Sequence, residues 1–538
     1  MPDEEENTDV EGTATKFDAP PEDAGQPLAR DADEEIYRVG KTELAPATRC
    51  TDEEIAEKRQ FWRKRLADGP IKYIVAPMVD QSELAFRMMM KAHGAHLTFT
   101  PMIHAHLFVN DTTYRRNALS FCAKDRPLVV QFCANKPDTF LAACRLVEGY
   151  CDGVDLNLGC PQMVAKRGRY GSYLQDEVDL ICTMVRGVRD YCRLPVSCKI
   201  RIRECRQQTV QYARRLVDAG ASMLTVHGRT REMKGAETGI ADWSRIKDVV
   251  DAVDVPVIGN GNIQMAGDVE RCMAETGVVG VMSAEGILNN PLLFTGQQME
   301  SSRVAEQYLE FAKKFEAGVS AIRAHIFRIC HHSMLEYPDL RKRLGVVFRM
   351  ADFDEIVAEL RARTTPIALE PDNVARVQKA AALFEEIRNG HRTLDIVQVA
   401  GTPHWLVKPY FRLAELAKER QGDDDDGPTY KEKRKEELKE LAEKHGLSLK
   451  QVRKRERRQI SMERKFHRTQ QSKYTPCARC GQPSGQGCAG IHCRKCCRWT
   501  CKRDNADCKT HRYKFSHLLL AVPTLPEAPD HEEHEADA

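Results

Sequence analysis

The 538-residue chain has no run of about 18 apolar residues, the length that a helix needs to cross a bilayer. We therefore expect no membrane-spanning segment and no membrane partner. The amino-terminal stretch "MPDEEENTDVEGTATKFDAPPEDAG" also lacks the basic and apolar regions of a signal peptide, because it is acidic and contains several prolines. This composition predicts an acidic, mostly disordered leader over residues 1–68 of an intracellular protein. A helix near residues 52–66, capped by Thr51 or Asp52, is expected inside the leader.

The chain as a whole has little excess of either charge, since its formal net charge is only +2. The charge is nevertheless uneven, because residues 428–515 contain about 25 Lys and Arg against about nine Asp and Glu. Cysteine is also uneven: of 20 cysteines, eight fall between Cys477 and Cys508. Inside a cell such cysteines are thiols or metal ligands rather than disulfides. A basic tail on an acidic body indicates nucleic-acid binding, and its basic runs could direct nuclear import, so we expect the protein in the cytoplasm, the nucleus or both.

Eight short β-branched runs alternate with segments of helical period between residues 69 and 296. The runs cover residues 73–79, 97–102, 128–133, 153–159, 196–202, 223–228, 255–261 and 280–286. Eight such units in about 220 residues fit a (β/α)8 TIM barrel, with a doubly wound open sheet as the alternative. The barrel is favoured because polar and glycine-rich residues recur at the carboxyl ends of the runs, where a barrel carries its chemistry.

The rest of the chain divides by composition. Residues 297–420 have a helical period without strand signals and predict an α-helical domain. An acidic linker and basic helix (421–475), a Cys-rich module (476–515) and an acidic tail (516–538) follow. Two stretches of the helical domain, "LRKRLGVVFR" and "KPYFR", are candidate contacts to RNA phosphates, with a solvated helix face as the alternative.

The predicted strand ends carry side chains that suit a flavin. Gln131 can hydrogen-bond the uracil-like edge of an isoalloxazine ring, and Lys199 can stabilise the reduced, anionic ring. The glycine-rich ends of the last two strands, "GNGN" and "SAEG", can present backbone N–H groups to a phosphate. Cys160 follows the fourth strand as a buried filler, a metal ligand or a chemical participant. These features predict a cofactor site without fixing the cofactor.

The motifs "APM", "QF", "DLNLGCP", "CKIR", "VHGRT" and "NGNI" occur in an order and spacing similar to the tRNA-dihydrouridine synthase family. The resemblance covers residues 70–300 or so, and "HGRTREMKGAETGIADW", "AEGILNNPLLF" and "PHWLVKPYF" most resemble the eukaryotic subfamily acting at D-loop positions 16/17. It implies an FMN-binding barrel, a helical tRNA-binding domain, and NADPH or NADH as the reductant. The implied partners are tRNA and NAD(P)H, and we expect a monomer.

The resemblance also implies roles for individual residues. FMN would be contacted by Pro77, Met78, Val79, Gln131, Lys199, His227, Asn260, Gly261, Asn262, Ala284 and Glu285, and the substrate by Asn157, Arg201 and Arg229. Many family members have Gly-Arg where this chain has Ala284 and Glu285. Because a glutamate cannot pair with a phosphate, the phosphate would rest on backbone N–H groups, with the Glu285 side chain pointing away.

By the same resemblance Cys160 would be the general acid. Hydride from FMN would reach C6 of an extruded uracil, and Cys160 would donate a proton to C5 from the opposite face. An ordinary cysteine has a pKa of about 8.5 and is mostly protonated at neutral pH, which suits a proton donor. Pro161 and the loop flanked by Gly168 and Gly171 are expected to let the loop close over a base.

The Cys-rich module has the spacing C-x2-C-x7-C-x4-C-x2-C-C-x3-C-x6-C-x2-H, and its two C-x2-C pairs strongly indicate tetrahedral zinc. The predicted ligands are Cys477, Cys480, Cys488, Cys493, Cys496, Cys501, Cys508 and His511, with Cys497 and His492 as further candidates. They suffice for one or two ions, in a cross-braced arrangement or as a single zinc with spare thiols. We expect a structural finger that adds RNA affinity, with a protein-binding finger as the alternative.

The sequence therefore predicts reduction of uridine to 5,6-dihydrouridine in the D-loop of tRNA, with FMN and NAD(P)H. Two alternatives remain. An FMN-dependent dihydropyrimidine or dihydroorotate dehydrogenase would share the barrel and the flavin, but would act on a free base and would not need the basic tail. A zinc-finger RNA-binding protein with an inactive barrel would have no need of Cys160, Lys199 and His227.

Overall fold

The computed structural model describes residues 31–39, 44–235, 238–388, 399 and 401–409, with scattered positions between 438 and 458 and most positions from 477 to 513. The chain separates into two compact units, Met1–Gly427 and Pro428–Ala538, and each is described by itself. Among the helices of the described ranges, none is both long and apolar enough to cross a membrane.

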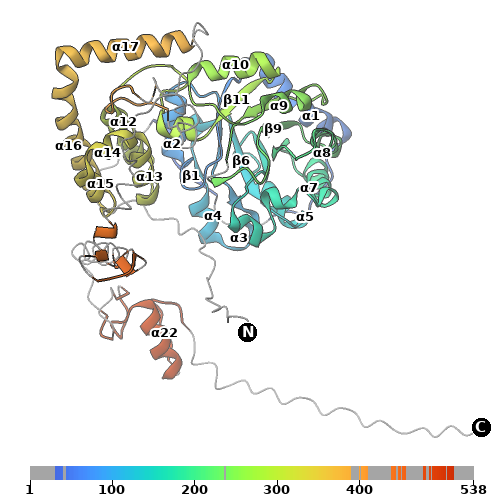
Figure 1. Ribbon diagram of the computed structural model, residues 1–538. Helices are drawn as coiled ribbons and strands as arrows, with labels where there is room; N and C mark the ends of the chain where they lie inside the picture. Colours follow the sequence, from blue (N-terminus) through green and yellow to red (C-terminus); the bar gives the residue numbers. More distant parts are fainter. Residues whose placement is uncertain are drawn as a thin grey trace, which may run out of the picture. The chain divides into compact units, whose positions relative to one another are not determined.

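The first unit is built around a closed barrel of parallel strands (Figure 1). In barrel order the strands are β2 (Tyr73–Val75), β3 (Leu97–Phe99), β6 (Leu128–Cys133), β7 (Gly153–Leu158), β8 (Val196–Arg201), β9 (Met223–His227), β10 (Val257–Asn260) and β11 (Gly280–Ser283). The pairs β3–β6 and β11–β2 close the ring, so the predicted barrel is confirmed and the open sheet is excluded. Several strands are shorter than predicted, because the chain leaves the ladder at the carboxyl ends to form loops.

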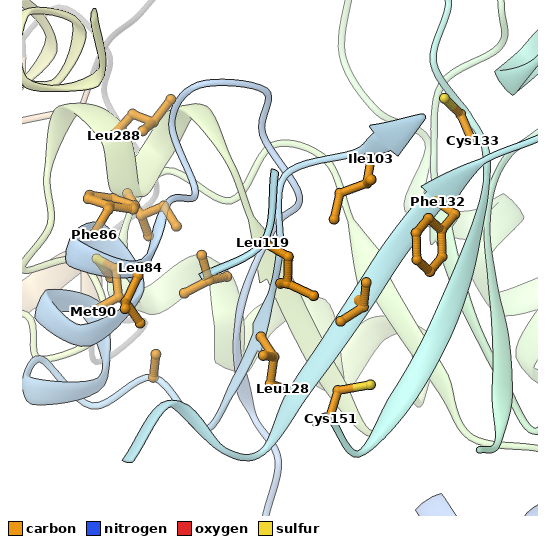
Figure 2. Packing of buried hydrophobic residues seen from close by; sticks show 14 of the residues in the cluster. Leu84, Phe86, Met90, Ile103, Leu119, Leu128, Phe132, Cys133, Cys151 and Leu288 are labelled. Atoms are coloured by element: carbon orange, nitrogen blue, oxygen red, sulfur yellow. The ribbon is translucent and has the colours of Figure 1, made fainter. Parts of the chain in front are cut away.

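Helices cover the outside of the barrel. They are α2 (Leu84–Ala92), α3 (Ala105–Asn110), α4 (Thr112–Ala118), α5 (Pro137–Arg145), α7 (Val178–Tyr191), α8 (Arg206–Ala219), α9 (Trp243–Val250) and α10 (Ala266–Thr276). Two short helices, α6 (Met163–Gly168) and α11 (Glu285–Asn289), belong to the segments that follow the carboxyl ends of β7 and β11. In α7 the buried residues Ile181, Val185 and Val188 recur at helical spacing and face the strands. Figure 2 shows the same core around α2 and β6, with Phe86 and Phe132 among its buried side chains.

The helix α1 (Asp52–Ala67) closes the amino-terminal end of the barrel. Thr51 caps it, since its hydroxyl accepts a hydrogen bond from the backbone N–H of Glu54. Trp62 is only 1% exposed and packs with side chains that line the barrel interior, including Ile74 and Met282. The helix was expected, but its burial in the barrel was not.

Other parts of the predicted leader are ordered as well. The strand β1 (Tyr37–Arg38) pairs antiparallel with β5 (Ser120–Phe121). Lys58 of α1 donates from Nζ to the Cys192 carbonyl at 2.6 Å. The expectation of a mostly disordered leader is therefore wrong for residues 31–39 and 44–68. The open end of the barrel exposes apolar side chains that α1 covers. Because the leader as a whole is acidic, its composition did not indicate that α1 would be buried.

A helical domain follows the barrel, as predicted. Its helices are α12 (Ser301–Lys314), α13 (Val319–Ile329), α14 (His331–Glu336), α15 (Pro338–Leu344), α16 (Met350–Leu369) and α17 (Pro371–Arg388). α12 packs against α2 of the barrel and against α16. Glu83, just before α2, accepts a hydrogen bond from Tyr308 Oη at 2.8 Å and lies 3.0 Å from Nε2 of the buried His325. These contacts fasten the helical domain to the barrel.

Candidate active site

We call the carboxyl end of the barrel the mouth. Amide, carboxylate and hydroxyl side chains of β6, β7 and β8 form a buried hydrogen-bond network in the barrel. Gln131 Nε2 donates to Asp155 Oδ2, and Asn157 Nδ2 donates to Gln131 Oε1, both at 2.8 Å. Ser197 Oγ donates to Asp155 Oδ1 at 2.7 Å. Burial raises the pKa of Asp155 to about 6, against the hydrogen bonds from Ser197 and Gln131. The network fixes the Gln131 amide and leaves it one N–H and one lone pair for a further partner.

Lys199 lies opposite Asn157 in the β7–β8 register. Its Nζ donates to Asn260 Oδ1 at 2.8 Å, and Asn260 Nδ2 donates to the Met282 carbonyl at 2.8 Å. Burial, followed by the charge of Arg201, lowers the pKa of Lys199 to about 8. The hydrogen-bond partner of this cation is thus a neutral amide. An anionic group bound at the mouth would stabilise its charged form, which fits the anionic ring or the phosphate of a flavin.

The ends of β9 and β10 are braced against each other. Arg229 Nη1 lies 3.0 Å from His227 Nε2, and Nη2 hydrogen-bonds Asn262 Oδ1. Gly261 has φ +113°, and a Cβ there would lie 2.6 Å from the Cβ of Ala241 and 3.0 Å from Cδ2 of His227. Only glycine allows this approach. The predicted cofactor residues His227, Gly261 and Asn262 are therefore close together.

The remaining predicted cofactor contacts lie in the loops after β2 and β11, which are neighbours in the barrel. Pro77 and Met78 are half-buried, and Val79 is exposed. Ala284 is half-buried and Glu285 is exposed at the first position of α11.

Cys160 lies two residues after the end of β7 and is half-buried. Among the described barrel cysteines, all but Cys160 and Cys205 are buried. Burial raises the pKa of the Cys160 thiol, against the lowering effects of the Gln162 backbone N–H and the charges of Arg201 and Lys199. The thiol is therefore protonated at neutral pH, as a proton donor requires.

The backbone of Cys160 is held on both sides. Its N–H donates to Asn157 Oδ1 at 3.0 Å, and its carbonyl accepts from the N–H of Ser172 at 3.1 Å and from the Ser172 hydroxyl at 2.9 Å. Gly171 has φ +66°, and a Cβ there would lie 2.8 Å from the Cys160 carbonyl oxygen. At Cys160 the loop therefore begins with a turn that is hydrogen-bonded to Asn157 on one side and to Ser172 on the other. The helix α6 and the 3-10 helix η3 (Gly171–Leu174) follow it.

Two residues that the sequence did not single out fasten the same turn. Tyr173 Oη donates to the Pro161 carbonyl at 3.1 Å, and Lys234 Nζ, from the loop after β9, donates to it at 3.3 Å. Lys234 Nζ also donates to Tyr173 Oη at 3.1 Å. Asp155 was missed in the same way, although a charged residue inside an apolar strand was a visible signal.

The three predicted substrate contacts are engaged with the protein itself. Asn157 bonds Gln131 and the Cys160 turn, as described above. Arg201 is 8% exposed and donates from Nε to the Gly159 carbonyl at 2.8 Å and from Nη1 to the Thr230 carbonyl at 2.7 Å. Arg229 is 7% exposed and braces the β9 and β10 loops. These side chains shape the mouth, and their known contacts are structural.

Apolar side chains are exposed in the segments that follow three strands, two of them at the start of α6. Their exposed fractions are 45% for Val79 after β2, 57% for Met163 and 53% for Val164 after β7, and 68% for Ile240 after β9. Exposed apolar side chains at a site are typical of a surface that receives a ligand. We call these four residues the apolar rim.

A cavity of about 480 Å³ lies between the barrel and the helical domain. Its lining includes Asp80 and Pro101 from the barrel and Phe315 from the helical domain.

The predicted phosphate contact Lys408 of "KPYFR" is only 3% exposed, and its Nζ donates to the Thr402 carbonyl at 2.7 Å. Lys408 is therefore part of the domain's packing and not a surface cation.

Residues 74–365 match the family model described as dihydrouridine synthase (Dus). This chain belongs to the dihydrouridine synthase family. A mouse relative named tRNA-dihydrouridine(16/17) synthase NAD(P)(+)-like is 40% identical over 462 residues, which cover 86% of this chain and 91% of the relative. A Saccharomyces cerevisiae relative named tRNA-dihydrouridine(16/17) synthase NAD(P)(+) is 39% identical over 359 residues, covering 63% and 83%. A second protein of that yeast, named for positions 20a/20b, is 33% identical over 306 residues, covering 56% and 82%.

The predicted family and the oxidoreductase class are thereby confirmed. Identity is higher to the relatives named for positions 16/17 than to the one named for 20a/20b, as the motifs predicted. The family match of this dihydrouridine synthase begins in β2 and ends in α16, so it covers the barrel and part of the helical domain. The Cys-rich module lies outside the match.

In that module the helix α22 (Arg494–Arg503) is surrounded by cysteines. Two groups have ligand atoms within 4.8 Å of one another: Cys488, Cys497, Cys508 and His511 form one, and Cys477, Cys493 and Cys496 the other. Cys497, a further candidate in the prediction, belongs to the first group, and the predicted ligand Cys501 lies beside it, with its Sγ 3.7 Å from Cys497 Sγ. The two lie one turn apart on α22, both buried, and the sequence could not distinguish them. Cys480 lies outside the described residues.

Proposed function

We propose that this protein reduces uridine to 5,6-dihydrouridine at positions 16 and 17 of the tRNA D-loop, with FMN as cofactor and NAD(P)H as electron source. The observation that carries the proposal is the place of Cys160, whose backbone N–H donates to Asn157 Oδ1, while Lys199 lies opposite Asn157 on the neighbouring strand. Cys160 and Lys199 both lie at one barrel mouth. The names of the relatives, which specify tRNA positions 16/17 and NAD(P)(+), support the substrate and the reductant.

The residues present fit FMN. Lys199 would hold the negative charge of the reduced ring, Gln131 would hydrogen-bond the pyrimidine edge, and His227 would lie beside the cofactor. The phosphate would lie near Asn260, Gly261, Asn262 and Ala284, on backbone N–H groups rather than on the exposed Glu285. When bound, FMN supplies the hydride that the uracil C6 receives.

The chain's own contribution to the reaction is a proton. Cys160 holds it on Sγ and delivers it to C5 of the uracil, which balances the hydride added at C6. The thiolate left behind takes a proton from solvent before the next turnover. Asn157, Ser172 and Tyr173 keep the turn that carries Cys160 at a fixed height above β7. A fixed donor suits general acid catalysis, because the donor atom must lie within hydrogen-bond reach of the acceptor carbon.

The substrate base must leave the RNA stack to reach the mouth, because a barrel interior admits no duplex. The apolar rim would receive the extruded base and its neighbours, since bases stack on apolar and aromatic surfaces. The segments that carry it follow the carboxyl ends of β2, β7 and β9, which is the end of the barrel at which the mouth lies.

The second unit, residues 428–538, is proposed to add affinity for tRNA phosphates. In α22 the cations Arg494, Lys495, Arg498 and Arg503 are exposed. Removing residues after 421 should weaken tRNA binding and make it less sensitive to salt, because fewer counterions are released. An unchanged affinity would instead indicate a protein-binding role for this unit.

A reconstituted reaction tests the central proposal. The purified protein, an unmodified tRNA transcript and NADPH or NADH should give dihydrouridine at positions 16 and 17, and free uridine should not react. Cys160→Ala should lose at least about 100-fold in rate, within the range for general acids, while flavin absorbance is retained. Cys205→Ala is the matched control, since Cys205 is the other half-buried barrel cysteine, and it should keep full activity. A Cys160→Ala variant that keeps a rate within about tenfold of wild type, or a protein that cannot be loaded with FMN, would contradict the proposal.

A further inference from the structure

The Cys-rich module contains two groups of potential metal ligands, and the distances inside the first group are those of a tetrahedral site. Cys488 Sγ and Cys501 Sγ each lie 3.7 Å from Cys497 Sγ, and Cys508 Sγ lies 3.5 Å from His511 Nδ1. The group whose ligand atoms all lie within 4.8 Å of one another is Cys488, Cys497, Cys508 and His511, without Cys501. A tetrahedral ion with Zn–S bonds near 2.3 Å separates two sulfur ligands by about 3.8 Å and a sulfur from a nitrogen by about 3.6 Å. A disulfide would bring two sulfurs to about 2.05 Å. The group therefore has the spacing of a metal site.

The two groups alternate along the chain. Cys477 belongs to the second group, Cys488 to the first, and Cys493 and Cys496 to the second again. The adjacent residues Cys496 and Cys497 then belong to different groups. This interleaving joins both groups through the start of α22, so neither group can form in a separate segment.

We infer that this module binds two zinc ions in a cross-braced arrangement. Cys488, Cys497, Cys508 and His511 complete the first site, and Cys477, Cys493 and Cys496 supply three ligands of the second. Three thiolates and an imidazole favour zinc over hard cations such as magnesium or calcium. The sites are structural, because the first is closed by four protein ligands and its cysteines are buried.

The metal sites determine how the module presents its cations. α22 begins with the cysteines of both groups, so the ions fix the helix on which Arg494, Lys495 and Arg498 are exposed. On the same helix Trp499 is 47% exposed, and the guanidinium of Arg479 lies 3.5 Å from its ring centre. Folding energy for so small a module comes from the metal more than from a core.

Metal content of the purified full-length chain tests the inference. Inductively coupled plasma mass spectrometry should find two zinc ions per chain. Cys497→Ser should reduce this to one, and Cys501→Ser, the matched control one turn away, should keep two. Cys493→Ser should remove the other ion. Flavin absorbance and dihydrouridine formation on the same samples report the barrel separately, so failure of the zinc inference and failure of the enzyme proposal are distinguishable.

Cobalt substitution provides a second measurement if a serine variant unfolds the module. Cobalt in the wild-type chain should give the intense visible bands of tetrahedral thiolate coordination. Iron with sulfide in place of zinc, fewer than two zinc ions in the wild type, or loss of an ion in Cys501→Ser but not in Cys497→Ser would each overturn the assignment.

Discussion

Replacing Lys199 by Met should stabilise the flavin-free protein at pH 7 and weaken flavin binding. The pKa of Lys199 falls from 10.5 to about 8, mainly because of burial. At 1.36 kcal/mol per unit this corresponds to a cost of about 3 kcal/mol for keeping the cation in the folded state. Partial solvent screening reduces that figure, and an unpaired Asn260 oxygen costs the variant about 1 kcal/mol. The expected net gain is about 1 kcal/mol.

The stability gained in Lys199→Met should decrease as the pH rises. Because the folded pKa of Lys199 lies below the unfolded one, the cost is fully present below about pH 8 and disappears as pH rises through the unfolded value of 10.5. Urea unfolding of the flavin-free proteins at pH 7 and pH 9.5 measures this, and the gain should shrink by at least half at pH 9.5. Lys72→Met, at an exposed lysine, is the control and should change stability by under about 0.5 kcal/mol. A Lys199→Met protein less stable than wild type at pH 7, or a gain independent of pH, would refute the reasoning.

Three further predictions concern other parts of the first unit. Trp62→Ala should lower the free energy of unfolding by about 3–5 kcal/mol, seen as a lower urea midpoint, because it empties the closed end of the barrel. Tyr173→Phe should lower kcat about fivefold without changing flavin affinity, since the lost hydrogen bond to Pro161 is worth about 1 kcal/mol; an unchanged kcat would show that this bond does not position Cys160. Although burial alone would raise the pKa of Glu83, the charge and hydrogen bond of His325 hold it below its ordinary value of 4.5. Glu83→Gln should therefore destabilise the protein by about 1–3 kcal/mol at pH 7, and the difference should vanish as pH falls through the folded pKa, which urea midpoints at pH 7 and pH 3.5 can check.

The barrel could be predicted from sequence because each of its strands is a short apolar run with its own turn. All eight expected runs contain a strand, and most are shorter at their carboxyl ends, where ladder bonds give way to loops; β10 also begins two residues later than predicted. The covering role of α1 could not be predicted, because its partners are strand residues far along the chain. Local composition gives the charge of the leader, but it does not indicate that Trp62 fills the amino-terminal end of the barrel.

The sequence could predict which residues lie at the candidate site but not which contacts each of them makes there. Motif matching located Cys160 and Lys199, which the structure places at one mouth. Motif matching could not show that the Arg201 guanidinium donates its hydrogen bonds to backbone carbonyls, because such contacts depend on how two loops fold. Nor could spacing choose between Cys497 and Cys501, which occupy the same side of one helix. In each case the missing information is a three-dimensional neighbour.

The burial of Trp62 has a consequence for biosynthesis. A ribosome releases α1 before any strand of the barrel, yet the side chains around Trp62 come from strands as late as β11. Throughout translation of more than two hundred residues the helix therefore has no completed docking site, and its large apolar ring stays available to chaperones or to other nascent chains. Closure of the barrel and capture of α1 must then occur together, late and over long sequence separation, which predicts slow folding for this unit.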